Sequence, residues 1–421
     1  MSSSKTYHST MSVSVEKNSG LINVENFNIQ NNRVVEIFLE LKKILIKENF
    51  THVYLSRIMG KQVIRYTHLY SSDKPIILKQ LFSDEDNLLC LFELFLLDNH
   101  VQITRIEKIL GKDLISRMIK EEILLLSDNN SIGSKISITP FDSHHLINEG
   151  HREFEPLHIH QVSRSQNYVY EVFKLLKKNV KEFKNNKILD LCSGSGALGM
   201  SVSNLDSEIC GIDLNPRAIE IGKLNSEFNQ RKTNYLLGNA NNGWINEDKF
   251  DLIVSNPPFH GLIDSDPLDA KTSRLIVHAG EFGDSSTKSI LSNLKKNISE
   301  NGNSIIIANW LLKDNKLAYP AIDELTQNGT LLLFHDPIVK ADTWEGIRTL
   351  YWADKLEALP NGFFKKFLKK AHFNQVCFGV VCWLKNKGPG GFHMIENTVE
   401  RDTNIISNWA KLKIKEIFGS S

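Results

Sequence analysis

The 421-residue sequence has few cysteines, no excess of charge of either sign and no apolar run of membrane-spanning length. Its five cysteines are an odd number without a CxxC pair, which argues against a disulfide framework and against a cysteine zinc site. A net charge of +1 gives no general attraction to nucleic acid or anionic lipid. Residues 1–20 are Ser-rich and lack the apolar core of a signal peptide, so we expect a disordered tail and a cytoplasmic protein without a membrane partner.

The length suggests two or three domains, and residues 21–150 predict a mainly helical one. "VVEIFLELKKILI" repeats apolar residues at helical spacing, and "LLCLFELFLL" is apolar nearly all round, as in a buried helix. The following residues predict a short helix, a turn at Gly111, a second helix and a β-hairpin at about Asn129 to Gly133.

Two helices followed by a hairpin suggest a winged helix-turn-helix, a module that often binds nucleic acid. A phosphate-binding surface needs clustered positive charge, yet residues 1–150 hold 17 Lys+Arg against 18 Asp+Glu. That balance favours a helical domain that shapes a substrate pocket or an interface, with the winged helix as the alternative.

Residues 151–421 predict an α/β domain with a C-terminal extension. From about residue 165, the strand-length apolar runs "KILDLC", "EICGIDL", "NYLLGNA", "FDLIVSN" and "SIIIANW" alternate with helix-length stretches. This alternation is typical of a Rossmann-like, mostly parallel sheet with helices on both faces. Ligands of such sheets bind at the carboxyl ends of the strands, so we expect the chemistry just after each run.

The first strand ends at Asp190 and leads into "CSGSGALG", where Gly194 and Gly196 flank Ser195. Small residues let the backbone approach a ligand closely, and the next helix presents free N–H groups. NAD and FAD sites use similar turns, and a tight strand-to-helix turn without a ligand is the alternative.

The second strand ends at Asp213, where an acidic side chain can accept both hydroxyls of a bound ribose. The alternative, an Asp that caps the next helix, is weakened because Asn215 followed by Pro216 already has the pattern of an N-cap and first helical residue. The third strand ends in "LLGNANNGW", where Asn239 is a candidate contact for an adenine edge. These residues point to an adenosine-containing cofactor.

The fourth strand ends in "FDLIVSNPPFHG", where two prolines support a carboxamide and a flat ring. Pro257 and Pro258 fix their own φ and restrict the residues before them, so the segment is a nearly rigid elbow. The Asn256 side-chain oxygen and the Pro257 carbonyl can accept both N–H bonds of one planar NH2 group, while Phe259 lies against its π-system. This arrangement aims the nitrogen lone pair at an electrophile by positioning and electrostatics.

"DLCSGSG", "GIDLNPRAI" and "FDLIVSNPPFHG", in this order and spacing, resemble the class I S-adenosylmethionine-dependent methyltransferases of the Asn-Pro-Pro-aromatic group. The group includes release-factor glutamine and rRNA guanine-N2 methyltransferases, and "HAGEFGD" (278–284) is similar to a Gly-rich segment of the glutamine enzymes. The resemblance covers about 165–325, with weaker continuity to 390.

The resemblance implies an enzyme that transfers methyl from S-adenosyl-L-methionine to a planar amino or amide nitrogen. The substrate is a nucleic-acid base in RNA, a protein glutamine or a small molecule, and the alternative is a non-catalytic S-adenosylmethionine-binding or docking protein on the same fold. Cys192 stands where the family often has glycine, and Asn239 where it often has Asp. The implied catalytic residues are Asn256, Pro257, Pro258 and Phe259, and the implied cofactor-binding residues are Asp190, Cys192, Gly194, Ser195, Gly196, Asp213, Leu214, Asn239, Ala240 and Asn256.

Four histidines, His144, His145, His158 and His160, are candidate metal ligands by residue type. Because no Asp, Glu or Cys stands at ligand spacing from them, we expect no metal. His260 follows the elbow and either contacts substrate or lies in a solvent-facing loop.

Two stretches, 363–373 and 409–419, alternate apolar residues with lysines. They fit phosphate contacts or amphipathic helices with solvated lysines, and we favour the helices. Arg164 and Gln166, at the start of the first core helix, are interpreted as lining the mouth of the pocket.

Overall fold

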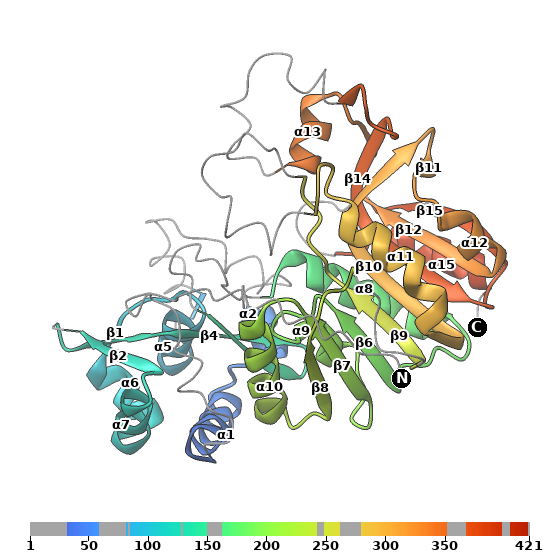
Figure 1. Ribbon diagram of the computed structural model, residues 1–421. Helices are drawn as coiled ribbons and strands as arrows, with labels where there is room; N and C mark the ends of the chain where they lie inside the picture. The colour runs from blue at the N-terminus through green and yellow to red at the C-terminus, as the bar shows by residue number, and fades with distance from the viewer. Residues whose placement is uncertain are drawn as a thin grey trace, which may run out of the picture.

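In the computed structural model, the described residues are 32–58, 81–82, 85–127, 129–149, 162–241, 248–261, 279–351, 368–397 and 405–419 (Figure 1). The predicted disordered tail, residues 1–20, lies outside these ranges, as do His158, His160 and residues 363–367 of the first lysine-rich stretch.

The N-terminal region is mainly helical, as the apolar periodicity predicts. Gly111, at φ 78°, separates the two helices of the predicted turn, and the predicted hairpin is antiparallel. A third short strand, β1, pairs with the second strand of this hairpin, so the small sheet has the order β1-β3-β2. A helix, a strand, two helices and a hairpin follow the order that a winged helix requires; the winged helix itself stays a prediction. The elements are α1 (Asn32–Lys47), α2 (His52–Ile58), α5 (Asp86–Phe95), β1 (Val101–Gln102), α6 (Ile103–Leu110), α7 (Lys112–Lys120), β2 (Leu124–Ser127) and β3 (Ser131–Ser134).

A second hairpin, β4 (Ile136–Phe141) and β5 (His144–Glu149), joins this region to the α/β core. β5 packs on α10 (Pro216–Asn229), and the apolar core of the N-terminal helices includes Leu224 and Phe228 from that helix. The predicted domain boundary at residue 150 stays a prediction, because apolar packing is continuous across this junction.

The main sheet has ten strands and is mostly parallel, as predicted. Its path is β15-β12-β14-β10-β9-β6-β7-β8, and β14 is antiparallel to both of its neighbours. The five predicted strands are all present, although β10 begins six residues before the predicted run. The strands are β6 (Lys187–Leu191), β7 (Glu208–Asp213), β8 (Thr233–Leu237), β9 (Phe250–Ser255), β10 (Ile298–Lys313), β12 (Gly329–His335), β14 (Gln375–Lys385) and β15 (Gly391–Glu396), with β11 (Lys316–Leu317) and β13 (Val339–Lys340) beside this path.

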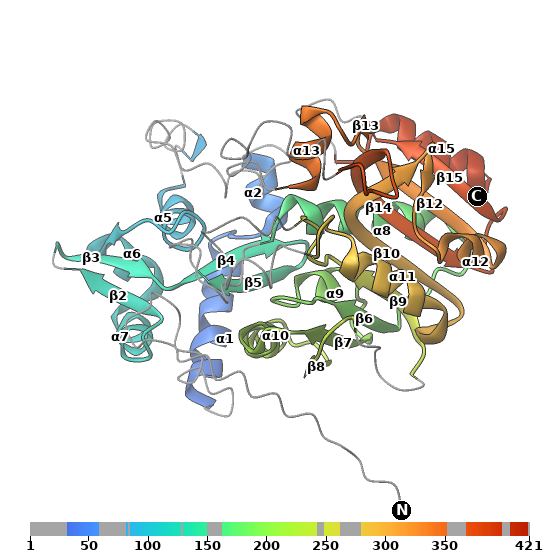
Figure 2. The same cartoon turned by 45° about the horizontal axis from the view of Figure 1, so that its top comes forward.

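Helices cover both faces of the sheet (Figures 1 and 2), which confirms the Rossmann-like prediction. Successive strand residues alternate between faces, so Ile188 belongs to the apolar cluster that includes α8 and α15, and Leu189 belongs to the cluster that includes α11. The second lysine-rich stretch forms α15 with Ala410 and Ile414 buried, which confirms the amphipathic helix. The helices are α8 (Arg164–Asn179), α9 (Ala197–Ser201), α11 (Ser285–Asn297), α12 (Ile322–Gln327), α13 (Trp344–Leu350) and α15 (Asn408–Phe418).

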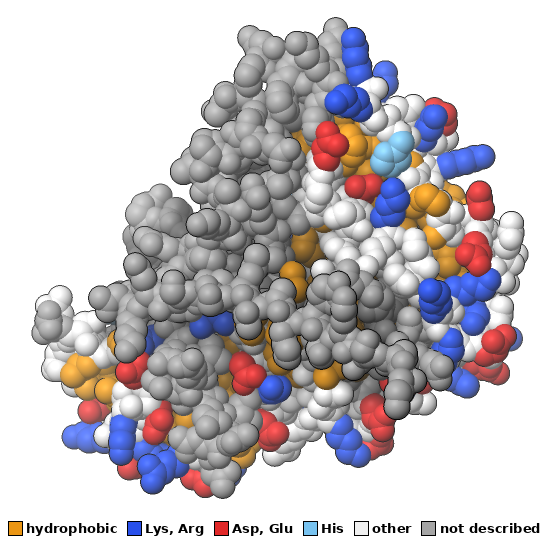
Figure 3. Space-filling model, viewed as in Figure 1, with side chains coloured by type: hydrophobic (Ala, Val, Ile, Leu, Met, Phe, Trp, Pro, Cys, Tyr) orange, Lys and Arg blue, Asp and Glu red, His pale blue; other side chains and the backbone are white. Residues whose placement is uncertain are grey.

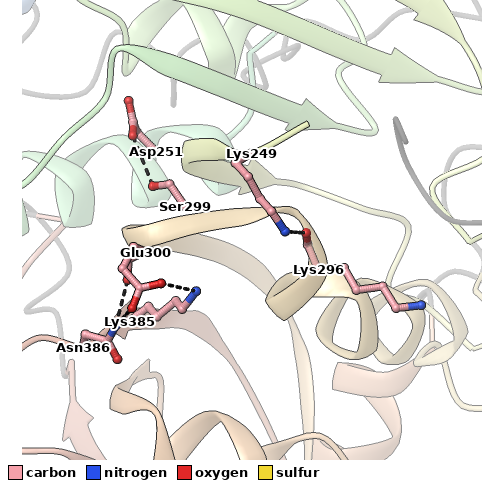
Figure 4. A network of polar contacts seen from close by, with 7 residues as sticks. All are labelled: Lys249, Asp251, Lys296, Ser299, Glu300, Lys385 and Asn386. Carbon is pink, nitrogen blue, oxygen red and sulfur yellow. Dashed lines mark hydrogen bonds and ion pairs between the residues drawn. The ribbon is translucent and has the colours of Figure 1, made fainter. Parts of the chain in front are cut away.

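Polar contacts tie together the amino ends of β9 and β10 (Figure 4). The Ser299 hydroxyl donates to the Asp251 carboxylate at 3.2 Å, and the Asn386 amide donates to the Glu300 carboxylate at 2.9 Å. Lys385 adds an ion pair with Glu300 at 3.8 Å. These contacts stabilise the end of the sheet that lies opposite the predicted site.

Two absences concern the residues given above. Within those ranges, no helix has both the length and the apolar character needed to cross a membrane. The same ranges contain no group of three or more His, Cys, Asp or Glu side chains that could hold a metal ion.

His144 and His145 have structural partners in the junction between β5 and its neighbours. The His144 Nε2 atom accepts from Arg231 at 2.9 Å, and the His145 Nε2 atom lies 2.6 Å from the Phe50 carbonyl. Burial is the main cause that lowers the pKa of each ring to about 4. Both histidines are therefore neutral near pH 7.

Acidification from pH 7 to pH 5 should therefore weaken this junction. A folded-state pKa of about 4 lies below the ordinary 6.5, so the unfolded chain binds more protons and stability falls as the pH drops through this window. We expect a loss of about 2 kcal/mol for each histidine. Urea unfolding at both pH values measures it: His145→Gln should flatten the pH dependence, and His100→Gln, at an exposed position, should not. Equal slopes in wild type and His145→Gln would contradict the prediction.

Candidate active site at the carboxyl ends of the central strands

The predicted site residues follow three adjacent strands of the sheet. Strand β6 lies between β7 and β9, and Leu191 pairs with Ile212 on one side and with Ser255 on the other. Asp190, Asp213 and Asn256 are each within one residue of these pairs. The parallel pairing therefore brings together three positions that are up to 66 residues apart in sequence.

The turn after β6 is held by backbone hydrogen bonds and positive φ angles. The Ser193 N–H donates to the Ile212 carbonyl at 3.1 Å, and the Gly196 N–H donates to the Ser193 carbonyl at 2.8 Å. Cys192 lies at φ 56°, a left-handed conformation that glycine adopts more readily than cysteine. A Cβ placed on Gly194 would meet no atom of the described residues within 4 Å, so these residues leave open space over this part of the turn.

The buried Asp190 carboxylate joins the end of β6 to the start of α9. Its Oδ2 atom accepts from the Gly199 N–H at 2.8 Å. Its Oδ1 atom is buried without a hydrogen-bond partner among the described residues. Burial raises the pKa of Asp190 well above its usual range.

Asp213 links the glycine turn to the helix that follows β7. Its Oδ2 atom accepts from the Gly194 N–H at 2.8 Å, and its Oδ1 atom accepts from the Asn215 N–H at 2.9 Å. Asn215 caps α10 by accepting from the Arg217 N–H, and Pro216 is the first helical residue, as the sequence predicts. Burial raises the pKa of Asp213, and backbone N–H bonds from Asn215, Gly194 and Leu214 oppose this rise. A carboxylate has about four lone-pair sites, so these bonds still leave some acceptor capacity for a ligand.

The residues after β7 and β8 border the same end of the sheet. Leu214 is 48% exposed, although it directly follows the half-buried Asp213. The Asn239 Oδ1 atom accepts from the Asn241 N–H at 2.9 Å and closes a turn, and Ala240 is buried. The adenine contact of Asn239 stays a prediction, since this oxygen already stabilises its own loop.

The elbow after β9 presents a carboxamide oxygen without a partner. Asn256 Oδ1 is buried and accepts no hydrogen bond from any residue whose position is described. Pro257 is buried, and the half-buried Phe259 ring lies 5.8 Å from the Phe378 ring of β14. A buried oxygen without a donor costs about 1–3 kcal/mol, so a ligand N–H that bonded to this acceptor would remove that cost.

A buried asparagine in β10, which the sequence analysis missed, supports the elbow. The Asn309 side chain donates to the Phe259 carbonyl at 3.2 Å and also to the Thr349 carbonyl. The Gly261 N–H donates to the Leu350 carbonyl at 2.8 Å, so α13 holds the end of the elbow. The available signal was one amide in the otherwise apolar run "SIIIANWLL".

The Gly-rich segment 279–284 also supports the elbow. The Ala279 N–H donates to the His260 carbonyl at 3.0 Å, and the Tyr351 hydroxyl donates to the Glu281 carbonyl at 3.1 Å. The His260 ring stacks at a tilt on Phe259 at 4.9 Å. A substrate contact by His260 stays a prediction.

The interpretation of Gln166 changes with the structure. Its side chain accepts from the Ser163 N–H at 2.7 Å and forms a capping box at the start of α8. This cap accounts for Gln166 without a ligand. A place for Arg164 at the pocket mouth stays a prediction.

Residues 165–328 match the family model described as the methyltransferase small domain. Among curated relatives, the chain is 32% identical over 133 residues to the ribosomal protein uL3 glutamine methyltransferase of Francisella tularensis, covering 28% of this chain and 40% of the relative. It is 31% identical over 156 residues to the release factor glutamine methyltransferase of Mycoplasma mycoides, covering 34% of this chain and 55% of the relative. The chain therefore spans about half or less of the relatives' length.

The solved structure of an S-adenosylmethionine-dependent methyltransferase from Agrobacterium tumefaciens matches 60% of this chain and 71% of its own. The identity is 9% and the TM-score is 0.34, a likeness too weak to transfer any residue's role.

The fold and the family match define a class I methyltransferase core. Residues 165–328 match the methyltransferase small domain, and this part of the chain is a class I S-adenosylmethionine-dependent methyltransferase core. S-adenosylmethionine is the cofactor of this family.

Three features of the structure fit this cofactor. Open space lies over Gly194, the neighbouring Asp213 carboxylate keeps acceptor capacity for ribose hydroxyls, and the Asn256 oxygen lies two strands away from Asp213. The site therefore combines a turn of small residues with two side-chain oxygens, on Asp213 and Asn256, at the carboxyl ends of the two strands that flank β6.

Proposed function

We propose that this protein transfers the methyl group of S-adenosylmethionine to a planar amino or amide nitrogen. The observation that carries the proposal is the buried Asn256 oxygen, which has no hydrogen-bond partner in the described part of the chain and lies on a proline-supported elbow beside the glycine turn. An acceptor held in this state selects a substrate that brings an N–H donor.

The proposed role of the elbow is to hold one NH2 group by both of its hydrogens. The Asn256 side-chain oxygen and the Pro257 carbonyl accept the two N–H bonds, which draws the nitrogen lone pair out of conjugation. Phe259 lies against the flat group that bears the nitrogen. Asn309 keeps the elbow in place through the Phe259 carbonyl. When bound, S-adenosylmethionine supplies an electrophilic methyl group on its sulfonium sulfur.

The chemistry then needs no nucleophilic side chain. The new N–C bond forms as the S–C bond breaks, and the alkylated nitrogen loses an N–H proton to water. The protein's contribution is positioning, together with acceptors placed where positive charge develops. In this proposal Asp213 holds the ribose, while Asp190 and the turn from Cys192 to Gly196 shape the cofactor pocket.

The substrate remains one of three classes: a nucleic-acid base, a protein glutamine or a small molecule. The two relatives support glutamine, since both are glutamine methyltransferases that act on a protein. The face in Figure 3 shows Lys and Arg interspersed with Asp and Glu, which gives no particular support to a large RNA surface. All five cysteines are free thiols, which supports the cytoplasmic location that we include in this proposal.

Transfer of tritium from methyl-labelled S-adenosylmethionine into fractionated RNA, protein and metabolites tests the proposal. We expect label in one fraction, on a nitrogen that acid hydrolysis and chromatography identify. Binding of the cofactor without label in any fraction would instead favour the non-catalytic alternative, in which the fold serves sensing or docking.

A further inference from the structure

Helix α10 carries two buried asparagines, one turn apart, that bind the backbone of β5. The Asn225 side chain accepts from the Ile147 N–H at 2.6 Å and donates to the Ile147 carbonyl at 2.8 Å. The Asn229 side chain accepts from the His145 N–H at 3.0 Å and donates to the His145 carbonyl at 2.8 Å. Four residues of helix rise about 6 Å, close to the rise of two strand residues, so the two spacings match. The two carboxamides therefore replace a neighbouring strand at the edge of β5.

The two asparagines differ in their third contact. Asn225 donates its second N–H to the Ser195 carbonyl at 2.9 Å, and Ser195 lies between Gly194 and Gly196 in the cofactor turn. Asn229 donates its second N–H to the Asn225 carbonyl within the same helix, at 2.9 Å. Asn225 is completely buried. Its hydrogen bonds join the β4–β5 hairpin to the glycine turn.

The beginning of α10 has a further link to β5. Arg217, in the first turn after Asn215, forms an ion pair with Glu149 at the end of β5, and both side chains are largely buried. The helix is therefore held to β5 along most of its length, from Arg217 near Asp213 to Asn229. A shift of the hairpin would move the helix that carries these contacts, because the buried partners cannot exchange for water without cost.

We infer that Asn225 is a positioning residue that couples docking of the β4–β5 hairpin to cofactor affinity. The Asn225 carboxamide makes two hydrogen bonds to Ile147 of the hairpin and a third to the Ser195 carbonyl. Only while the two bonds to the hairpin are formed does the third hold Ser195 in the position that suits the ligand. The N-terminal region thereby acts on the methyltransferase core through one side chain. This inference rests on the proposed cofactor role of the glycine turn.

The matched variants Asn225→Ala and Asn229→Ala test the coupling. Each removes one carboxamide from β5, so both should lower the urea midpoint. We expect the Kd for S-adenosylhomocysteine, measured by calorimetry where both variants are folded, to rise about 10-fold in Asn225→Ala, the value of one hydrogen bond. It should stay within about 2-fold of wild type in Asn229→Ala. KM for S-adenosylmethionine should rise in Asn225→Ala with kcat unchanged, a split that general destabilisation does not produce.

Hydrogen exchange tests the same coupling in the other direction. Because coupling between sites is reciprocal, S-adenosylhomocysteine should slow exchange of the Ile147 amide in wild type. If Asn225→Ala does not fold, Asn225→Asp, which keeps the acceptor for the Ile147 N–H, is compared with Asn229→Asp. Equal affinities in the two matched variants would overturn the inference while the cofactor site stands. Failure of wild type to bind S-adenosylhomocysteine would overturn the proposed site and the inference with it.

Discussion

Replacing Asn256 by Ala should lower kcat for methyl transfer by about 100- to 1,000-fold, the usual cost of removing one preorganised polar group from a reaction site. The Asn256 oxygen is the proposed acceptor that orients the substrate nitrogen. Stability should change in the opposite direction, because no described residue donates a hydrogen bond to this buried oxygen. We expect the free energy of unfolding to stay the same or rise by about 1 kcal/mol. Single-turnover transfer and urea unfolding measure the two effects.

Two comparisons make the Asn256 result specific. Asn256→Asp keeps an oxygen acceptor and should retain more activity than Asn256→Ala. Both variants should bind S-adenosylhomocysteine within about 3-fold of wild type, since the glycine turn and Asp213 are unchanged. Full activity in Asn256→Ala would refute the proposed role of the elbow, and a lost affinity would assign Asn256 to cofactor binding instead.

Replacing Gly196 by Ala should destabilise the protein by about 3 kcal/mol, because a left-handed backbone and a steric overlap act together. Gly196 lies at φ 78°, and a Cβ there would lie 1.9 Å from the Tyr235 hydroxyl oxygen and 2.8 Å from its Cζ atom. Tyr235 points inward from β8 and is buried, so the ring has little room to move. Urea unfolding measures the loss, and calorimetry should show weakened binding of S-adenosylhomocysteine.

The neighbouring glycine provides the control. Gly194→Ala carries a similar backbone cost at φ 52°, about 1 kcal/mol, but its Cβ would meet no protein atom. It should therefore leave the fold nearly intact while its methyl group occupies the space proposed for the cofactor. Adding Tyr235→Phe should recover about 1 kcal/mol in Gly196→Ala by removing the overlapping oxygen. Equal stabilities of the two glycine variants would contradict the steric explanation.

Much of the α/β core was predictable because its signals are local. Each of the strands β6, β7, β8 and β9 is a short apolar run followed by polar or small residues. The end of such a strand can therefore be recognised from five or six consecutive residues of the sequence. The cap of α10 at Asn215 was predictable for the same reason. Parallel pairing then placed the residues after these strands together, as the rule for ligands at carboxyl ends requires.

The later strands were not predictable at the same level. "QVCFGVVCWL" is a short apolar run whose pairing partners no local signal indicates, and it becomes β14, antiparallel between β10 and β12. Nothing within ten residues specifies such an insertion, because Ile305 and Cys382 pair across 77 positions. The capping box that Gln166 forms at the start of α8 is a local signal too, while a place for Gln166 at the pocket mouth stays a prediction.

By itself, the sequence determined the kind of sheet, the glycine turn, Asp213 and the elbow, since apolar period, glycine and proline act on the backbone within a few residues. Only the tertiary structure decided which buried amides support them. Asn309 holds the elbow and Asn225 joins β5 to the glycine turn, from positions 50 and 30 residues away from their acceptors. A buried carboxamide must find both donors and acceptors, and where those lie depends on packing between elements, which a one-dimensional pattern does not contain.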